Sequence, residues 1–158
     1  MPLIIDGHNL LHSIKKVTEG SESISEFRLC RIISEYLRLT DEKGEIVFDG
    51  TGPQDKSLFD NINTLEVFFA GLGSDADAVI ESKIKASTAP KRLTIVSADR
   101  RLWDAARGRK AAVVKSQVFW EKLCRRLSRK KAAKEPPAKH LGITESETEQ
   151  WLKLFELE

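Results

Sequence analysis

The apolar residues of this chain are concentrated in short runs separated by longer mixed stretches. The runs fall at residues 3–5, 46–48, 65–69, 93–96 and 111–114. Uninterrupted aliphatic runs of this length are typical of strands buried on both faces of a parallel sheet. In the run at 65–69, Leu65, Val67 and Phe69 alternate with Glu66 and Phe68, which fits a strand at the sheet edge. The pattern therefore predicts roughly five strands.

The mixed stretches between the runs carry apolar residues at helical spacing. They predict a short helix or turn within 7–20 and helices at 24–39, 74–86, 100–107 and from 116 to about 131. Ser23 and Glu26 have the spacing of a capping box for the 24–39 helix, and Ser74 is the expected N-cap of the 74–86 helix. Strands alternating with helices predict an α/β fold, a three-layer sandwich with a mostly parallel, roughly five-stranded sheet.

The composition changes after the last helix of this predicted domain, which we place at 1–131. Residues 132–143 are rich in Lys, Ala and Pro and are expected to form a basic linker. Residues 144–158 predict a C-terminal amphipathic helix with Trp151 and Phe155 on its apolar face. This helix either packs back on the domain or binds another protein. Packing on the domain is favoured, because exposed Trp and Phe side chains are costly in water.

Length and composition describe one soluble globular domain with a tail. The chain has 158 residues, of which 41% are hydrophobic and 32% charged. Its two cysteines, Cys30 and Cys124, lie on predicted apolar helix faces and are expected to be core residues. We expect no signal peptide, no membrane span and no membrane partner, because Asp6 interrupts the apolar run nearest the N-terminus. The expected location is the cytoplasm.

Charge is distributed unevenly along the chain, although the net charge is only +2. Between residues 107 and 139 a dense series of Lys and Arg is opposed only by Glu121 and Glu135. Such a run indicates a polyanionic partner, although many charge runs are only solvated helix faces.

Acidic residues follow three of the predicted strands. Asp6, Asp49 and Asp99 come at the ends of the first, second and fourth strands. The carboxyl ends of parallel strands meet at one edge of a sheet, which is where ligands bind in open α/β folds. These acids are therefore candidates for an active site, although a single residue such as Asp6 could instead cap the following turn.

A second group of acids lies in the first turns of the 74–86 helix, at Asp75, Asp77 and Glu81. A helix N-terminus favours carboxylates whatever the function, but the same dipole would keep Asp77 ionised and ready to hold a cation. Carboxylates crowded together raise one another's pKa unless a cation joins them. Hard oxygen ligands of this kind suit Mg²⁺ or Mn²⁺.

Four motifs in this order resemble the YacP-like group of NYN domains, within the PIN-like nuclease superfamily. They are residues 3–9 (LIIDGHN), 47–50 (VFDG), 76–81 (ADAVIE) and 96–99 (VSAD), and the resemblance covers roughly residues 2–130. It implies a PIN/NYN-like, Rossmann-like fold and a metal-dependent endoribonuclease. The implied partner is RNA, free or presented on a ribosome, and the residues themselves do not distinguish RNA from DNA.

The resemblance also implies roles for individual residues. Asp6, Asp77 and Asp99 would bind Mg²⁺ or Mn²⁺, with Asp49 as a further ligand. Asn9 would orient the loop after the first strand or contact the phosphate, and Ser97 would be a neighbouring hydrogen-bonding group. Candidates for an outer shell around the metal are Asp75, Glu81 and His8. His8 stands where the YacP-like group often has tyrosine, and a local structural role is its favoured interpretation.

Basic residues are expected to hold the phosphate backbone by charge. The candidates closest to Asp99 in sequence are Arg100, Arg101 and Arg107. Those on the outward face of the last helix of the domain are Lys122, Arg125, Arg126, Arg129 and Lys130.

Two alternatives to a nuclease come from other functional classes. One is a non-catalytic RNA-binding module with a vestigial acidic site. The other is a small-molecule phosphohydrolase, which lacks support because position 8 is His and not a second acid on the first strand. The sequence has no Ser/His/Asp or Cys/His arrangement, so hydrolysis by an acid-bound metal is the expected chemistry.

Overall fold

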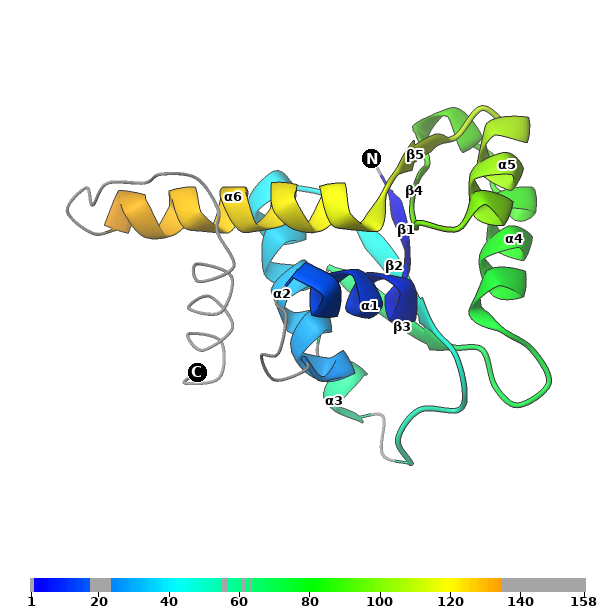
Figure 1. The fold of residues 1–158 in the computed structure, drawn as a ribbon, viewed down its shortest axis with the longest axis horizontal. Coiled ribbons are helices and arrows are strands. Elements are labelled where there is room, and N and C mark those ends of the chain that lie inside the picture. The colour runs from blue at the N-terminus through cyan, green and yellow to red at the C-terminus, as the bar shows by residue number, and fades with distance from the viewer. Residues whose placement is uncertain (1, 18–23, 55–56, 61, 63, 135–158) are drawn as a thin grey trace.

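Five parallel strands form the single sheet of the computed structural model, which describes residues 2–17, 24–54, 57–60, 62 and 64–134 (Figure 1). The strands are β1 (Leu3–Asp6), β2 (Gly44–Phe48), β3 (Leu65–Phe69), β4 (Thr94–Val96) and β5 (Ala112–Val114). Their order is β3-β2-β1-β4-β5, and every neighbouring pair is parallel. The α/β class, the strand count and the edge position of β3 are confirmed.

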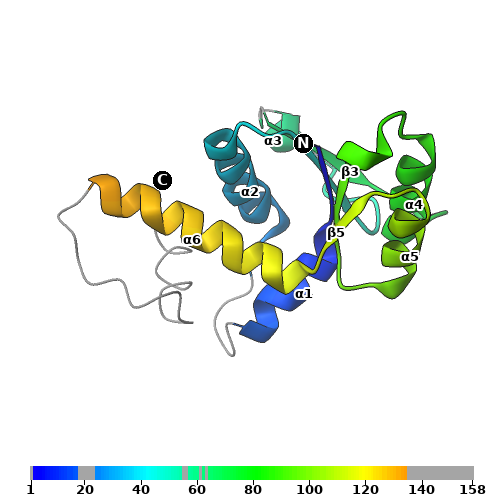
Figure 2. The same ribbon diagram turned by 90° about the horizontal axis from the view of Figure 1, so that it is seen from above.

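Helices cover both faces of the sheet. They are α1 (Gly7–Val17), α2 (Glu26–Thr40), α3 (Ser57–Asp60), α4 (Ala76–Ala86), α5 (Arg100–Gly108) and α6 (Ser116–Lys134), with a short 3₁₀ turn at Pro90–Arg92. Figure 2 shows α1, α2 and α6 on one side of the strands and α4 and α5 on the other. The molecule therefore has the three layers that the sequence predicts.

Side chains of β1 alternate between the two layers. Leu3 and Ile5 belong to the apolar cluster under α1, α2 and α6, whereas Ile4 belongs to the cluster under α4 and α5. All three are at least 94% buried, with exposures of 6% or less. Burial on both faces is the physical reason for the uninterrupted apolar run. It also makes β1 the central strand, so that its last residue, Asp6, lies in the middle of the sheet edge.

Several predicted helix starts were wrong. The N-cap of α2 is Ser25, whose hydroxyl accepts from the Arg28 N–H at 3.2 Å, and Ser23 lies outside the described residues. The N-cap of α4 is Asp75 and not Ser74. A capping carboxylate satisfies the same free N–H groups as a serine hydroxyl, so adjacent Ser and Asp residues compete for this position.

Three elements differ in extent from the prediction. The expected short helix or turn after Asp6 is the 11-residue helix α1, which begins directly at Gly7. The four-residue helix α3 was not predicted. Helix α6 runs to Lys134, beyond its expected end at about residue 131, so the first residues of the expected linker are helical. The remainder of that linker and the predicted helix at 144–158 lie outside the described residues.

Two further expectations concern the core and the membrane. Cys30 and Cys124 are buried in the apolar cluster under α1, α2 and α6, as predicted. Among the helices that the structure describes, none has the length and apolar character needed to cross a bilayer.

Candidate metal centre at the carboxyl edge of the sheet

Asp6 is a buried carboxyl group at the end of the central strand, with 5% of its surface exposed. The Ser97 hydroxyl donates to its Oδ2 atom at 3.3 Å, and the Asn9 backbone N–H donates to the same carboxylate. Asp6 thus also caps the start of α1, as the alternative interpretation held. Burial raises the pKa of Asp6 to about 6, the negative charges of Asp49 and Asp99 add to this, and the two hydrogen bonds oppose it.

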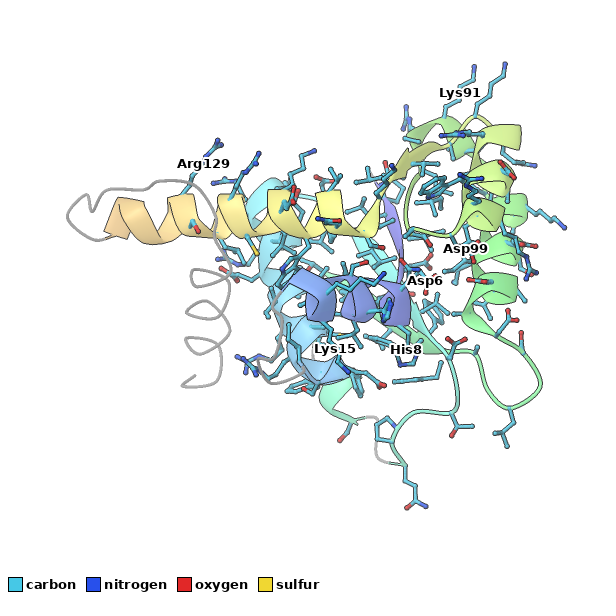
Figure 3. All side chains as sticks on the ribbon, viewed as in Figure 1. Asp6, His8, Lys15, Lys91, Asp99 and Arg129 are labelled. Carbon is cyan, nitrogen blue, oxygen red and sulfur yellow. The ribbon has the colours of Figure 1, made fainter. Side chains whose placement is uncertain are left out.

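Asp77 and Asp99 approach Asp6 from different elements. Asp77 lies in the first turn of α4 and Asp99 is the N-cap of α5. Figure 3 shows Asp6 and Asp99 together at the carboxyl ends of the strands. Asp77 shares a side-chain hydrogen bond with Asp99, and its pKa is raised by the charges of Asp6, Asp99 and Asp75. The convergence that the sequence predicts for these three acids is therefore present.

The protonation of Asp77 differs from the expectation that the helix dipole keeps it ionised. The pKa of Asp77 is raised to about 7, first by loss of hydration and then by its hydrogen bond to Asp99 and by the surrounding carboxylates. A dipole contribution of roughly 0.3–1 kcal/mol is smaller than the cost of several like charges in one partly dehydrated site. In the metal-free chain Asp77 is therefore partly protonated near neutral pH.

A network of short polar contacts holds the loops that carry the acids. Asn9 Oδ1 accepts from the Ala98 N–H at 2.8 Å and from the Ser116 hydroxyl at 2.6 Å. The Ser97 hydroxyl, which donates to Asp6, also accepts from the Asp99 N–H at 3.1 Å. Asn9 therefore holds the loop after β4 through its oxygen, whereas the role implied by the resemblance concerned the loop after the first strand.

Two residues in this network were not predicted. Ser116 is fully buried and touches Asn9 across 107 positions of sequence. The Trp103 indole N–H donates to the Ser97 carbonyl oxygen at 2.7 Å. Nothing local to either residue signals these contacts, because a serine at a helix start and an aromatic residue in an amphipathic helix both have common structural explanations.

His8 connects three elements beside the acids. Its Nδ1 atom accepts from the Asp49 N–H at 3.1 Å, so the neutral ring carries its proton on Nε2, which lies 3.1 Å from Glu26 Oε1. The ring also packs edge-on against Phe48, with centroids 5.3 Å apart. These contacts join the start of α1 to α2 and to the loop after β2, which favours the structural interpretation of His8. Its partner Glu26 was not predicted.

The remaining candidate acids are engaged with protein groups. Asp49 Oδ1 accepts from the Ala76 N–H at 2.8 Å, and its Oδ2 lies 3.5 Å from His8 Nδ1. Asp75 accepts from the Ala78 N–H at 2.7 Å as the cap of α4. Glu81 pairs with the Arg101 guanidinium. Asp49 and Asp75 hold the segment that presents Asp77, and Glu81 holds a cation beside the site.

The donor set that remains, Asp6, Asp77 and Asp99, fits Mg²⁺ or Mn²⁺. All its donors are carboxylate oxygens, which these hard cations prefer. Loss of hydration and, after it, neighbouring carboxylates raise the pKa values of Asp6 and Asp77, and a bound cation would favour their charged forms. Among the residues that the structure describes, no group of three or more His, Cys, Asp or Glu side chains is already arranged to hold a metal ion.

The candidate nucleic-acid-binding residues fall into two groups. Arg100, Arg101 and Arg107 are exposed on α5, the helix that Asp99 caps. On α6, Lys122, Arg125 and Arg129 are exposed, Arg126 is half-buried, and the side chain of Lys130 is not described. A helix rises about 1.5 Å per residue, which puts Arg129 roughly 20 Å from Ser116. Figure 3 shows Arg129 far along α6 from Asp6.

Comparison with known proteins defines the class to which this fold and site belong. The model of the YacP-like NYN domain matches residues 3–155, and the chain belongs to this family. NYN domains are PIN-like nuclease domains and generally use divalent metal ions. The match extends beyond the 2–130 range of the sequence motifs, so the family also accounts for most of the C-terminal segment.

Two similar solved structures are those of Rae1 (YacP) from Bacillus subtilis and of its W164L mutant. The first has a TM-score of 0.63 and 20% identity, and the match covers 99% of this chain and 92% of that one. For the mutant the TM-score is 0.64, the identity 19%, and the coverage 85% of each chain. This similarity establishes the shared fold. The comparison with curated proteins found no match.

Proposed function

We propose that this protein is a metal-dependent endoribonuclease that hydrolyses RNA phosphodiester bonds. The observation that carries the proposal is the convergence of Asp6, Asp77 and Asp99 at the carboxyl edge of the sheet, where the pKa values of the first two are raised. An NYN domain with this cluster has the ligand chemistry of a hydrolase that works through Mg²⁺ or Mn²⁺.

Each side chain around the cluster has a distinct part in the proposed reaction. Mg²⁺ or Mn²⁺ held by the three acids would polarise the scissile phosphate and lower the pKa of an attacking water. Ser97 fixes the orientation of the Asp6 carboxylate through its 3.3 Å hydrogen bond. Both hydrogen bonds of the Asn9 amide are made by Oδ1, and Nδ2 has no partner within the described residues. We assign Nδ2 as a donor to a phosphate oxygen, the second role that the sequence suggested.

Arg101 supplies positive charge next to the acids in this proposal. Its backbone N–H donates to Asp99 at 2.9 Å, and its guanidinium is held by Glu81 and is attracted by Asp75 and Asp77. A guanidinium in this position can offset the charge of the incoming phosphate. The more distant cations of α6 would bind phosphates further along the strand, with little information about base sequence.

The test is cleavage of a panel of labelled single-stranded and structured RNAs with Mg²⁺, Mn²⁺ or EDTA. Native protein is compared with Asp6→Asn, Asp99→Asn and the matched control Asp41→Asn. Asp41 is exposed, precedes β2 at the opposite end of the strands, and has φ 54°, which Asn tolerates well. We expect metal-dependent cleavage by the native and Asp41→Asn proteins and loss of cleavage in the other two.

A different result would point to the alternative function. If native protein binds RNA but cuts none of the panel with either metal, and Asp6→Asn binds equally well, the protein is an RNA-binding module with a vestigial acidic site.

A further inference from the structure

Three side chains that the acid cluster does not use meet where α5 and β5 come together. Trp103 is half-buried on α5. Lys115, between β5 and α6, places Nζ 5.5 Å from the centroid of the indole ring, and Arg107, in the last turn of α5, places Cζ 6.0 Å from it. Both cations are exposed. Contact with an aromatic face restrains long side chains that would otherwise move freely in water.

Lys115 and Arg107 carry charge that no carboxylate neutralises. Within the described residues, neither side chain has a carboxylate at ion-pairing distance. Arg101, Lys83 and Arg38, by contrast, pair with Glu81, Glu45 and Glu35. Contact with one indole ring sets these two apart from other unpaired surface cations, because it brings their charges to one place where they remain available to an anion.

The same cluster is tied to the acids by direct hydrogen bonds. The Trp103 indole N–H donates to the carbonyl of Ser97, whose hydroxyl contacts Asp6. The Ser97 N–H in turn donates to the Val114 carbonyl at 3.1 Å, directly before Lys115. On the other side, Lys115 precedes Ser116, which contacts Asn9. These hydrogen bonds therefore tie Trp103 and the backbone that carries Lys115 to the loop that carries the acids.

We propose that Lys115 and Arg107, held against Trp103, form a phosphate-binding subsite for the strand that runs through the acid cluster. Its ligand is a backbone phosphate flanking the scissile one. Single-stranded RNA is the favoured substrate, because an unpaired base can also stack on the exposed part of the half-buried indole, whereas a duplex hides its base faces. The identity of the strand rests on the proposed function, but binding at the subsite does not require cleavage.

The test measures affinity for a fluorescently labelled single-stranded oligoribonucleotide by anisotropy in EDTA, at several salt concentrations. The double variant Lys115→Ala/Arg107→Ala is compared with the matched double variant Lys91→Ala/Arg92→Ala. The control removes the same charge from an exposed 3₁₀ turn that precedes β4, at the other end of the strand from Asp99. Figure 3 shows Lys91 away from Asp6 and Asp99. Thermal melts identify any loss of folding.

The subsite variant is expected to bind about tenfold more weakly. Loss of the contact with one backbone phosphate should also lower the slope of log affinity against log salt by about 0.7, because each phosphate neutralised on a single strand contributes roughly that much. The control should stay within about twofold of native, since its charge is remote. The proposal is overturned if the subsite variant binds RNA with native affinity. It is also overturned if the control variant loses as much affinity as the subsite variant. If the subsite variant loses more affinity for duplex RNA than for single-stranded RNA, the choice of single strands is overturned.

Cleavage by native protein with Mn²⁺, measured in parallel, separates this proposal from the proposed function. If native protein cleaves RNA while the subsite variant binds with native affinity, the subsite is refuted and the nuclease stands. If the variant binds weakly while native protein cleaves nothing, the subsite stands and the nuclease is refuted.

Discussion

The burial of Asp6 should make the metal-free protein less stable as the pH rises. The pKa of this carboxyl is about 6 in the folded chain and 3.8 ordinarily. Between these values the folded state keeps the proton while the unfolded state releases it. The folded state then binds more protons, so the contribution of Asp6 to the free energy of unfolding falls with pH. That contribution is fully present below pH 3.8 and is lost once the pH has passed about 6.

The size of this effect follows from the two pKa values. Their difference corresponds to about 3 kcal/mol at about 1.4 kcal/mol per pH unit. Roughly 1 kcal/mol is already lost at pH 4.5, which leaves about 2 kcal/mol to be lost between pH 4.5 and 7.5. For a chain of this length, each kcal/mol corresponds to roughly 2–4 °C in Tm. Asp77 changes stability in the same direction, because its pKa is also raised.

The assay is urea denaturation of native and Asp6→Asn protein in EDTA across this pH range. The amide of the variant does not titrate, so its free energy of unfolding should gain about 2 kcal/mol relative to native between pH 4.5 and 7.5. Any constant offset from altered hydrogen bonding cancels in this comparison. Adding Mg²⁺ at pH 7.5 should stabilise the native protein, by about 2.7 kcal/mol at 100 times its Kd, and the variant far less. If the free energies of unfolding of native and Asp6→Asn protein change in parallel across the pH range, the reasoning is refuted.

Two further predictions concern packing around the site. Ser116→Ala removes the 2.6 Å hydrogen bond to Asn9 and should lower the free energy of unfolding by roughly 1 kcal/mol and slow RNA cleavage. Additive effects in a double-mutant cycle of Ser116→Ala with Asn9→Ala would contradict this coupling. Gly7→Ala places a methyl group against the Phe48 ring and should cost about 1–3 kcal/mol in urea denaturation. Gly73→Ala, where nothing lies within 4 Å, is the matched control, and equal losses in the two variants would remove the steric explanation.

The sheet and the acid cluster were predictable because both depend on local pattern. Strands buried on both faces leave uninterrupted apolar runs, and the residue after each run falls at the carboxyl edge. The runs ending before Asp6 and Asp99 therefore located two of the three acids. Asp77 was found by its place at the start of a helix, although a helix start alone would explain an acid there.

The contacts that orient the acids were not predictable in this way. Ser116 and Trp103 act on the site through hydrogen bonds that only the folded chain brings about, and neither position has a distinctive local pattern. Adjacent Ser74 and Asp75 satisfy capping chemistry almost equally, so the local sequence does not decide which of them is the N-cap of α4. The pKa of Asp77 depends first on loss of hydration and then on the charges of Asp99, Asp6 and Asp75, whereas the helix dipole that suggested the opposite is one local contribution.

The central claim is that Asp6, Asp77 and Asp99 jointly hold a divalent cation, and Mn²⁺ binding tests it most directly. Mn²⁺ affinity and stoichiometry can be measured by electron paramagnetic resonance at pH 7.5 for native protein, Asp77→Asn and the control Asp41→Asn. We predict one bound Mn²⁺ in the native and control proteins and an affinity at least about tenfold lower in Asp77→Asn, since a charged ligand is lost. Equal affinity in all three proteins would contradict the account.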